Sequence, residues 1–292
     1  MLSTEFLTQL EQLRIQCKQP FRGKYRGDRR SRNRGTGVEF ADYRQYEYGD
    51  DLRYLDWNVY ARLDKLFIKM FQTDQELTVS ILIDKSQSMK FGEPTKIDYG
   101  KKIAAALTYV ALANADRVTL YTFAERLSSV LPTLYGKTQY YRIQKALNTI
   151  ETSGTTRMTE SLNQFARSQQ KAGVVIILSD FLDTAGYTKG INSLIGRGFA
   201  LTMIHIQCSE EIEPPPQGEW QLEDTETGET KEITINEETI AHYQNQQQDY
   251  CESIHNYCKQ RGIGYVRINT DVDFELLILN NLQRIGFIKR KH

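Results

Sequence analysis

The sequence predicts a mixed α/β fold: a mostly parallel β-sheet with helices on both faces, an N-terminal cap rich in loops and β-structure, and an inserted β-hairpin. Two observations support this prediction. From residue 77 onward, short apolar segments alternate with longer segments of helical periodicity, which is the pattern of a parallel sheet covered by helices. In addition, Gly173, Gly198 and Gly264 lie where these helices give way to strands, the usual position of a helix C-cap.

The apolar runs predict the strands, and the segments between them predict the helices. We expect strands at 77–84, 117–123, 174–179 and 199–207, and helices at about 96–114, 139–151, 158–171 and 188–197. Three prolines at 214–216 interrupt this alternation, and the polar segment after them predicts a hairpin over about 218–236 that turns near Gly228. A helix over about 237–261, a strand beginning at Tyr265 and a helix over about 273–285 complete the fold.

The charge of the chain is balanced overall but unevenly distributed. The 292 residues include 37 Lys and Arg against 37 Asp and Glu, so the net charge indicates neither a nucleic-acid nor a membrane partner. Eight basic residues between Lys18 and Arg34 are opposed only by Asp28. This basic segment and the N-terminal helix form the first predicted part of the chain, 1–34. We expect a second part at 35–75, called the signature region below, that packs on the core, and an α/β domain at 76–292.

The same sequence predicts a cytoplasmic protein without a membrane span. No segment approaches the roughly 20 apolar residues that a spanning helix needs. The N-terminus is an amphipathic helix pattern and lacks the basic start and apolar centre of a signal peptide. The four cysteines have no CxxC spacing, which favours reduced thiols over a zinc site.

Acidic and hydroxyl side chains follow two of the predicted strands. Asp84, Ser86 and Ser88 come at alternate positions where the first strand ends, and Asp180 directly follows the third. Thr156 lies in a small, hydroxyl-rich loop before a helix. Because the carboxyl ends of parallel strands meet at one edge of a sheet, we expect these side chains to face one crevice. Such oxygen ligands, without His or Cys, suit Mg²⁺, with Mn²⁺ or Ca²⁺ as alternatives.

The balance of ligands in this crevice favours binding over catalysis. Hydroxyls take the place of most of the carboxylates, so a bound ion would keep much of its positive charge. It could then accept an acidic oxygen from outside. The sequence therefore predicts a site that binds a carboxylate of a partner protein.

These residues resemble a known site. The spacing of Asp84, Ser86 and Ser88, with Thr156 two residues after Gly154 and with Asp180 at a strand end, is similar to the metal-ion-dependent adhesion site of von Willebrand factor A domains. The resemblance implies a von Willebrand factor A-like, Rossmann-like fold. It also implies that these residues hold Mg²⁺ directly or through water.

A second motif lies upstream of the α/β domain and resembles the signature of a smaller group of proteins. It resembles the signature of the bacterial domain-of-unknown-function family 58, and its matching residues are Arg44, Tyr46, Gly49, Asp50, Arg53, Asp56, Trp57, Ala61 and Arg62. We interpret this signature as structural, because networks of carboxylates and guanidinium groups among aromatics more often fix a loop than react. The family is often linked with MoxR-type AAA+ ATPases, which implies an adaptor-like role with such an ATPase or its client as the partner.

The leading hypothesis is a non-enzymatic, metal-dependent protein-interaction module. A metal-dependent hydrolase of the phosphatase kind is the alternative, but phosphatases with an aspartyl nucleophile need a second carboxylate where this chain has Ser86. Nucleic-acid binding through residues 18–34 is a further alternative, less favoured because only Phe21 and Tyr25 could stack on bases.

Overall fold

The computed structural model describes residues 2–15, 39–72, 77–213, 217–223, 228, 230–284 and 286–290. Its contacts divide the chain into two compact units: one combines Met1–Gly23 with Leu77–His292, and the other is Lys24–Glu76. The basic segment predicted at 18–34 lies outside the described residues. Among those described, no helix combines the length and apolarity needed to cross a bilayer.

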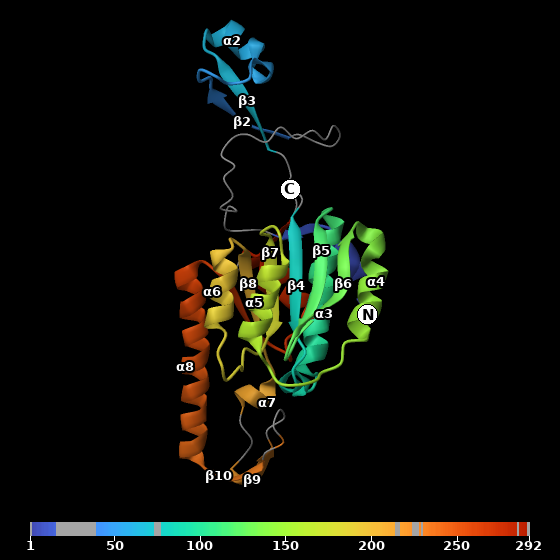
Figure 1. Ribbon diagram of the computed structural model, residues 1–292, viewed down its shortest axis with the longest axis vertical. Helices are drawn as coiled ribbons and strands as arrows, with labels where there is room; N and C mark the ends of the chain where they lie inside the picture. Colours follow the sequence, from blue (N-terminus) through green and yellow to red (C-terminus); the bar gives the residue numbers. More distant parts are fainter. Residues whose placement is uncertain are drawn as a thin grey trace. The chain divides into compact units, whose positions relative to one another are not determined.

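The larger unit is built around a six-stranded sheet (Figure 1). Its order is β11–β8–β7–β4–β5–β6, and all neighbours are parallel except β5 and β6. The strands are β4 (Thr78–Asp84), β5 (Arg117–Phe123), β6 (Leu127–Tyr135), β7 (Val174–Ser179), β8 (Ala200–Gln207) and β11 (Gly264–Asn269). Chain order reverses between β4 and β7, so their carboxyl ends flank the switch point where open α/β sheets bind ligands. The predicted fold class is confirmed.

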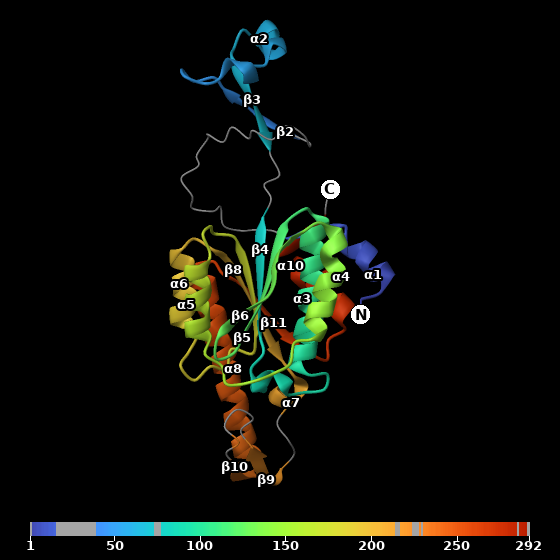
Figure 2. The same cartoon turned by 45° about the vertical axis from the view of Figure 1, so that its right-hand side comes forward.

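Helices cover both faces of this sheet, which Figure 2 shows nearly edge-on. One face packs on α1 (Thr4–Leu10), α3 (Lys96–Ala113), α4 (Tyr140–Asn148), α9 (Phe274–Leu276), a π-helical segment (Leu277–Asn281) and α10 (Leu282–Arg284). The other face packs on α5 (Met158–Ser168), α6 (Thr188–Gly196) and the second half of α8 (Glu237–Arg261). Every residue of β7 is buried, which explains why its sequence is apolar without alternation.

The N-terminal helix belongs to this α/β core. Phe6 and Leu10 are buried in the same cluster as α3, and Ser3 caps the helix by accepting a hydrogen bond from the N–H of Phe6. The chain then forms β1 (Leu13–Ile15), which pairs antiparallel with β12 (Ile288–Arg290). The two ends of the chain are thereby joined in one two-stranded sheet.

Strand β6 is not among the strands expected from the sequence. Its side chains are mostly exposed or half-buried in an irregular pattern, and Pro132 lies within it. An edge strand tolerates both features, because one of its sides needs no partner and one of its faces meets water. The sequence therefore carries neither an apolar run nor a regular period that would mark it.

The inserted hairpin follows a short helix, α7 (Ser209–Ile212), and precedes α8. It consists of β9 (Gly218–Glu223) and β10 (Thr230–Ile235), paired antiparallel. The side chain of Asn236 caps α8 by accepting a hydrogen bond from the N–H of Thr239 at 2.8 Å. Figure 1 shows the hairpin beyond the end of the sheet, with the first half of α8 beside it.

The smaller unit contains β2 (Glu39–Gln45) and β3 (Phe67–Gln72), which pair antiparallel. Between them lie a 3-10 turn (Leu52–Tyr54) and α2 (Trp57–Leu63). A bridge from Leu55 to Ile68 ties the turn back to β3, and both side chains are buried.

Gly173, directly before β7, is required by the close approach of β4. A Cβ atom at this position would lie 2.4 Å from the carbonyl oxygen of Thr78. We expect Gly173→Ala to lower the free energy of unfolding by about 2–3 kcal/mol, because the neighbouring strands would have to separate. Gly196→Ala is the control, since a Cβ there meets no atom within 4 Å. Urea denaturation measures both variants, and equal stabilities would contradict the prediction.

Candidate functional site

Two buried carboxylates lie at the switch point of the sheet. Asp84 ends β4 and Asp180 directly follows β7, the neighbouring strand, and both residues are 0% exposed. Burial, together with the charge of Asp180, raises the pKa of Asp84 to about 7. The site thus holds a carboxyl group that gives up its proton only near neutral pH.

Both oxygens of Asp84 are oriented by hydrogen bonds from the sheet edge. Oδ1 accepts from the backbone N–H of Ser86 at 2.9 Å, and Oδ2 accepts from the hydroxyl of Ser179 at 2.6 Å. The hydroxyl oxygens of Ser86 and Ser88 lie 3.1 Å apart. Ser179 is absent from the predicted site, although its position beside Asp180 at the end of a buried strand was a usable signal.

Thr156 lies on a loop that is fixed against the loop after β4. The N–H of Ser153 donates to the carbonyl of Lys85 at 2.8 Å, and the N–H of Gln87 donates to the carbonyl of Gly154 at 3.1 Å. Thr156 itself is 7% exposed. The structure therefore brings Asp84 and the two serines together beside Asp180, and it places Thr156 on the adjoining loop.

A buried lysine that the sequence analysis did not identify completes the cluster. Lys96 Nζ donates to Asp180 Oδ2 at 2.7 Å and also to Glu211 Oε1. Although burial lowers the pKa of Lys96, the charges of Asp180 and Glu211 hold it above its ordinary value, so the ammonium is retained. Lys96 is the first residue of α3, where the helix dipole disfavours a positive charge. A lysine at the first position of a predicted helix was therefore the feature of the sequence that could have indicated a buried acidic partner.

The cluster carries more negative than positive charge. Asp180 and Glu211 contact the ammonium of Lys96, and Asp84 adds a third carboxylate beside Asp180. Buried charge is costly unless it is compensated, so either protonation of Asp84 or a cation must offset the excess. Among the described residues, no three of His, Cys, Asp and Glu form a metal-binding group. A cation here would thus use hydroxyl oxygens as well, and such a donor set fits Mg²⁺.

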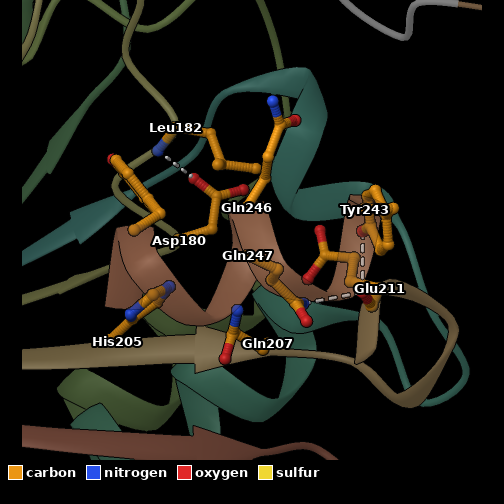
Figure 3. Close-up of a pocket in the computed structure, with 9 residues that line it drawn as sticks. Asp180, Leu182, His205, Gln207, Glu211, Tyr243, Gln246 and Gln247 are labelled. Carbon is orange, nitrogen blue, oxygen red and sulfur yellow. Dashed lines mark hydrogen bonds between the residues drawn. The ribbon is translucent and has the colours of Figure 1, made fainter. Parts of the chain in front are cut away.

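A pocket of about 250 Å³ opens beside Asp180 (Figure 3). Its lining comes from the ends of β7 and β8 and from α7 and α8: Asp180, Leu182, His205, Gln207, Glu211, Tyr243, Gln246, Gln247 and Tyr250. Tyr243 Oη and Gln247 Nε2 both donate to the backbone carbonyl of Glu211 at 2.7 Å. Helix α8 is therefore bonded to the residue that holds Lys96.

His205, which lines this pocket from β8, is a buried residue of the sheet. It is 1% exposed, and its Nδ1 lies 2.8 Å from the hydroxyl of Tyr265. Burial lowers the pKa of His205 to about 4, so the ring is neutral at physiological pH.

The upstream signature lies in the smaller unit, where Arg44 and Asp50 form an ion pair. Arg44 Nη2 lies 2.6 Å from Asp50 Oδ1, and Asp50 Oδ2 accepts from the N–H of Glu47 at 2.9 Å. These bonds close a turn in which Gly49 has φ +104°, a conformation that favours glycine. Arg53 pairs with Asp51, outside the signature, at 2.5 Å.

Asp56 organises the second half of the signature. Its Oδ1 accepts from the N–H groups of Asn58 and Val59 at the start of α2, and its Oδ2 accepts from the hydroxyl of Tyr43 at 2.8 Å. Tyr46 is half-buried, and its N–H donates to the carbonyl of Leu66 at 2.9 Å. Two further members of the signature, Trp57 and Arg62, are exposed.

Asp56→Ala tests whether the signature is structural. The substitution removes the N-cap of α2 and leaves Tyr43 without this acceptor, so it should destabilise the smaller unit by about 1–2 kcal/mol. Hydrogen exchange of the amides in 39–72 measures this effect, and exchange in 77–290 should not change. Trp57→Ala, at a position 62% exposed, is the control and should stay within about 0.5 kcal/mol. Unchanged exchange in Asp56→Ala would contradict a structural role.

Comparisons with known proteins assign this chain to a family. Uncharacterized proteins of Mycobacterium tuberculosis and Mycobacterium bovis are each 26% identical to it over 231 residues, which is 77% of this chain and 73% of theirs. The crystal structure of the conserved hypothetical protein BatB from Bacteroides thetaiotaomicron has a TM-score of 0.46 at 16% identity, and the match covers 72% of this chain and 98% of BatB. Proximal thread matrix protein 1 of the mussel byssus, described with a zinc-occupied MIDAS motif, has a TM-score of 0.39 at 18% identity, covering 46% of this chain and 39% of that one. Residues 42–252, well over half of the chain, match the family "Protein of unknown function DUF58", and the chain belongs to this family.

Proposed function

We propose that this chain is a non-enzymatic, metal-dependent protein-interaction module. In this proposal Asp84, Ser86, Ser88, Thr156 and Asp180 hold Mg²⁺ and a partner protein supplies an acidic side chain to it. The observation that carries the proposal is the excess of buried negative charge at the sheet edge, beside the hydroxyls of Ser86 and Ser88. Mg²⁺ bound there would supply a positive centre with a coordination position for a carboxylate.

The residues of the chain prepare the site for an anionic ligand. Ser86 N–H and the Ser179 hydroxyl fix the orientation of Asp84, and Lys96 already offsets the charge of Asp180. The remaining donors are neutral hydroxyls. Because Lys96 offsets part of the charge of the carboxylates, a divalent ion held by this set keeps part of its own charge, which favours an acidic group from outside.

A MoxR-type AAA+ ATPase, or a client of such an ATPase, is the partner that we propose. This part of the proposal rests on the resemblance of the signature region and on membership of the family. Ser86, two residues after Asp84, supports binding over phosphoester hydrolysis, because a second carboxylate would serve as general acid there.

Mg²⁺ titration by calorimetry and capture of the purified ATPase test the proposal together. The double variant Ser86→Ala, Ser88→Ala removes two oxygen ligands without changing the charge, and it should weaken Mg²⁺ binding by about tenfold or more. Capture should be lost in EDTA and reduced in the variant. Ser129→Ala, on exposed β6, is the control and should behave as the wild type.

Two results would overturn the proposal. One is capture that is equally strong in Mg²⁺ and in EDTA, which would make the ion irrelevant to the interaction. The other is Mg²⁺-dependent turnover of a phosphoester that is lost in the double variant, which would favour the hydrolase alternative.

A further inference from the structure

Lys96 lies between two carboxylates that come from different elements. Asp180 is at the end of β7, and Glu211 is in α7. The side chains of Lys96 and Asp180 are each 1% exposed, and that of Glu211 is 16% exposed. An ammonium group shared in this way between a buried acid and a partly exposed one is a fixed positive charge within the cluster.

Lys96 is one of two hydrogen-bond donors to the carboxylate of Asp180. Oδ2 accepts from Lys96 Nζ, and Oδ1 accepts from the N–H of Leu182 at 3.2 Å. Both oxygens therefore already have one donor each, and an ion that approaches Oδ2 meets the positive charge of the ammonium there. The Leu182 N–H is part of the backbone, whereas the ammonium has a second acceptor in Glu211 and can shift towards it without becoming unpaired.

We propose that Lys96 competes with the divalent ion for Asp180, and that Glu211 retains the ammonium when the ion binds. The inference rests on the proposed metal site and adds a regulating element to it. The affinity for the ion is set by how the ammonium is divided between the two carboxylates. Because Tyr243 and Gln247 donate to the carbonyl of Glu211, helix α8 positions the acceptor on which this division depends.

Two variants should change Mg²⁺ affinity in opposite directions. Lys96→Met removes the competing cation, so the dissociation constant should fall by about tenfold or more. Glu211→Gln weakens the alternative acceptor and leaves the ammonium on Asp180, so the constant should rise by about tenfold. Calorimetric titration of the full chain with Mg²⁺, repeated with Mn²⁺, measures both, and circular dichroism checks that each variant is folded.

Glu210→Gln separates competition from a general effect of charge. Glu210 is in the same short helix, and its side chain accepts from the N–H of Glu93. The Glu210→Gln variant loses the same negative charge as Glu211→Gln, and its dissociation constant for Mg²⁺ should stay within about twofold of the wild-type value. Lys101→Met, on α3, is the matched control for the lysine, because Lys101 pairs with Asp98. Equal effects of Glu210→Gln and Glu211→Gln would overturn the competition.

The outcomes distinguish this inference from the proposed function. If the wild type and both variants bind Mg²⁺ with the same constant, the inference is wrong and the metal site stands. If Lys96→Met binds Mg²⁺ and the wild type does not, the competition is supported and metal-dependent capture by the wild type is wrong. If none of them binds Mg²⁺ or Mn²⁺, both are wrong. Should Lys96→Met fail to fold, an unchanged constant in Glu211→Gln overturns the inference by itself.

Discussion

Asp84→Asn is expected to abolish Mg²⁺ binding and, in chelator at pH 8, to stabilise the protein. The substitution removes a charged ligand, so affinity should fall by about 100-fold or more. It also removes a buried charge that faces Asp180, so the free energy of unfolding should rise by about 1–2 kcal/mol. Ser179 Oγ, which now donates to Asp84, can accept from the new amide instead. Calorimetry and urea denaturation in EDTA measure the two effects.

The opposite signs of these effects distinguish a binding site from a structural ion cluster. A carboxylate that served the fold alone would lower stability when replaced. Asp116→Asn is the matched control, because Asp116 is buried and accepts from the N–H of Leu77 at the other end of β4. This variant should bind Mg²⁺ as the wild type does and lose stability. Mg²⁺ binding by Asp84→Asn within a few-fold of the wild type would contradict the assignment of Asp84.

The metal-free protein should lose stability between pH 5 and pH 8 through Asp84. The pKa of this carboxyl group is about 7 in the folded chain, against 3.8 as the reference value. Between these values the folded state holds a proton that the unfolded state has released, so stability falls as the pH rises. In EDTA, the unfolding free energy of the wild type should therefore fall by about 2–3 kcal/mol relative to that of Asp84→Asn between pH 5 and pH 8.

The wild type must be compared with Asp84→Asn because His205 changes the unfolding free energy with pH in the opposite direction. Its pKa is lowered to about 4, so its contribution to stability rises with pH up to its ordinary value near 6.5. Both proteins contain His205, and the subtraction removes it. Saturating Mg²⁺ should reduce the loss of wild-type stability at pH 8, because the ion offsets the charge of Asp84. A pH-independent difference in EDTA would show that Asp84 is ionised throughout this range.

The central sheet could be predicted because its strands are buried on both faces. Strand β7 reads as an apolar run that ends at Ser179, just before Asp180, and β4 reads as an apolar run interrupted only by Ser80 and ending in Asp84. Strand β6 could not be predicted in the same way. It lies at the edge with an exposed face and contains Pro132, so its residues follow the requirements of solvent and turn geometry rather than those of a core.

The acidic residues of the candidate site could also be expected from the sequence, because each lies at or directly after the end of an apolar strand. Their partners could not be located. Lys96 and Glu211 meet Asp180 only because α3 and α7 converge on the same edge of the sheet, from positions 84 and 31 residues away along the chain. A single sequence shows that a lysine begins a helix where its charge is unfavourable, but not which carboxylate compensates it.

The position of these residues along the chain also determines when the site can exist. Asp84, Lys96, Thr156 and Asp180 precede Glu211, and they meet only after the parallel neighbours β4 and β7 have paired across a long crossover. Such non-local contacts form late, because closing long loops costs entropy before the contacts repay it. During synthesis, the ammonium of Lys96 cannot reach its second acceptor until α7 has left the ribosome. In our proposal the ammonium then stays on Asp180, and the affinity for the divalent ion rises only once α7 has joined the assembled sheet.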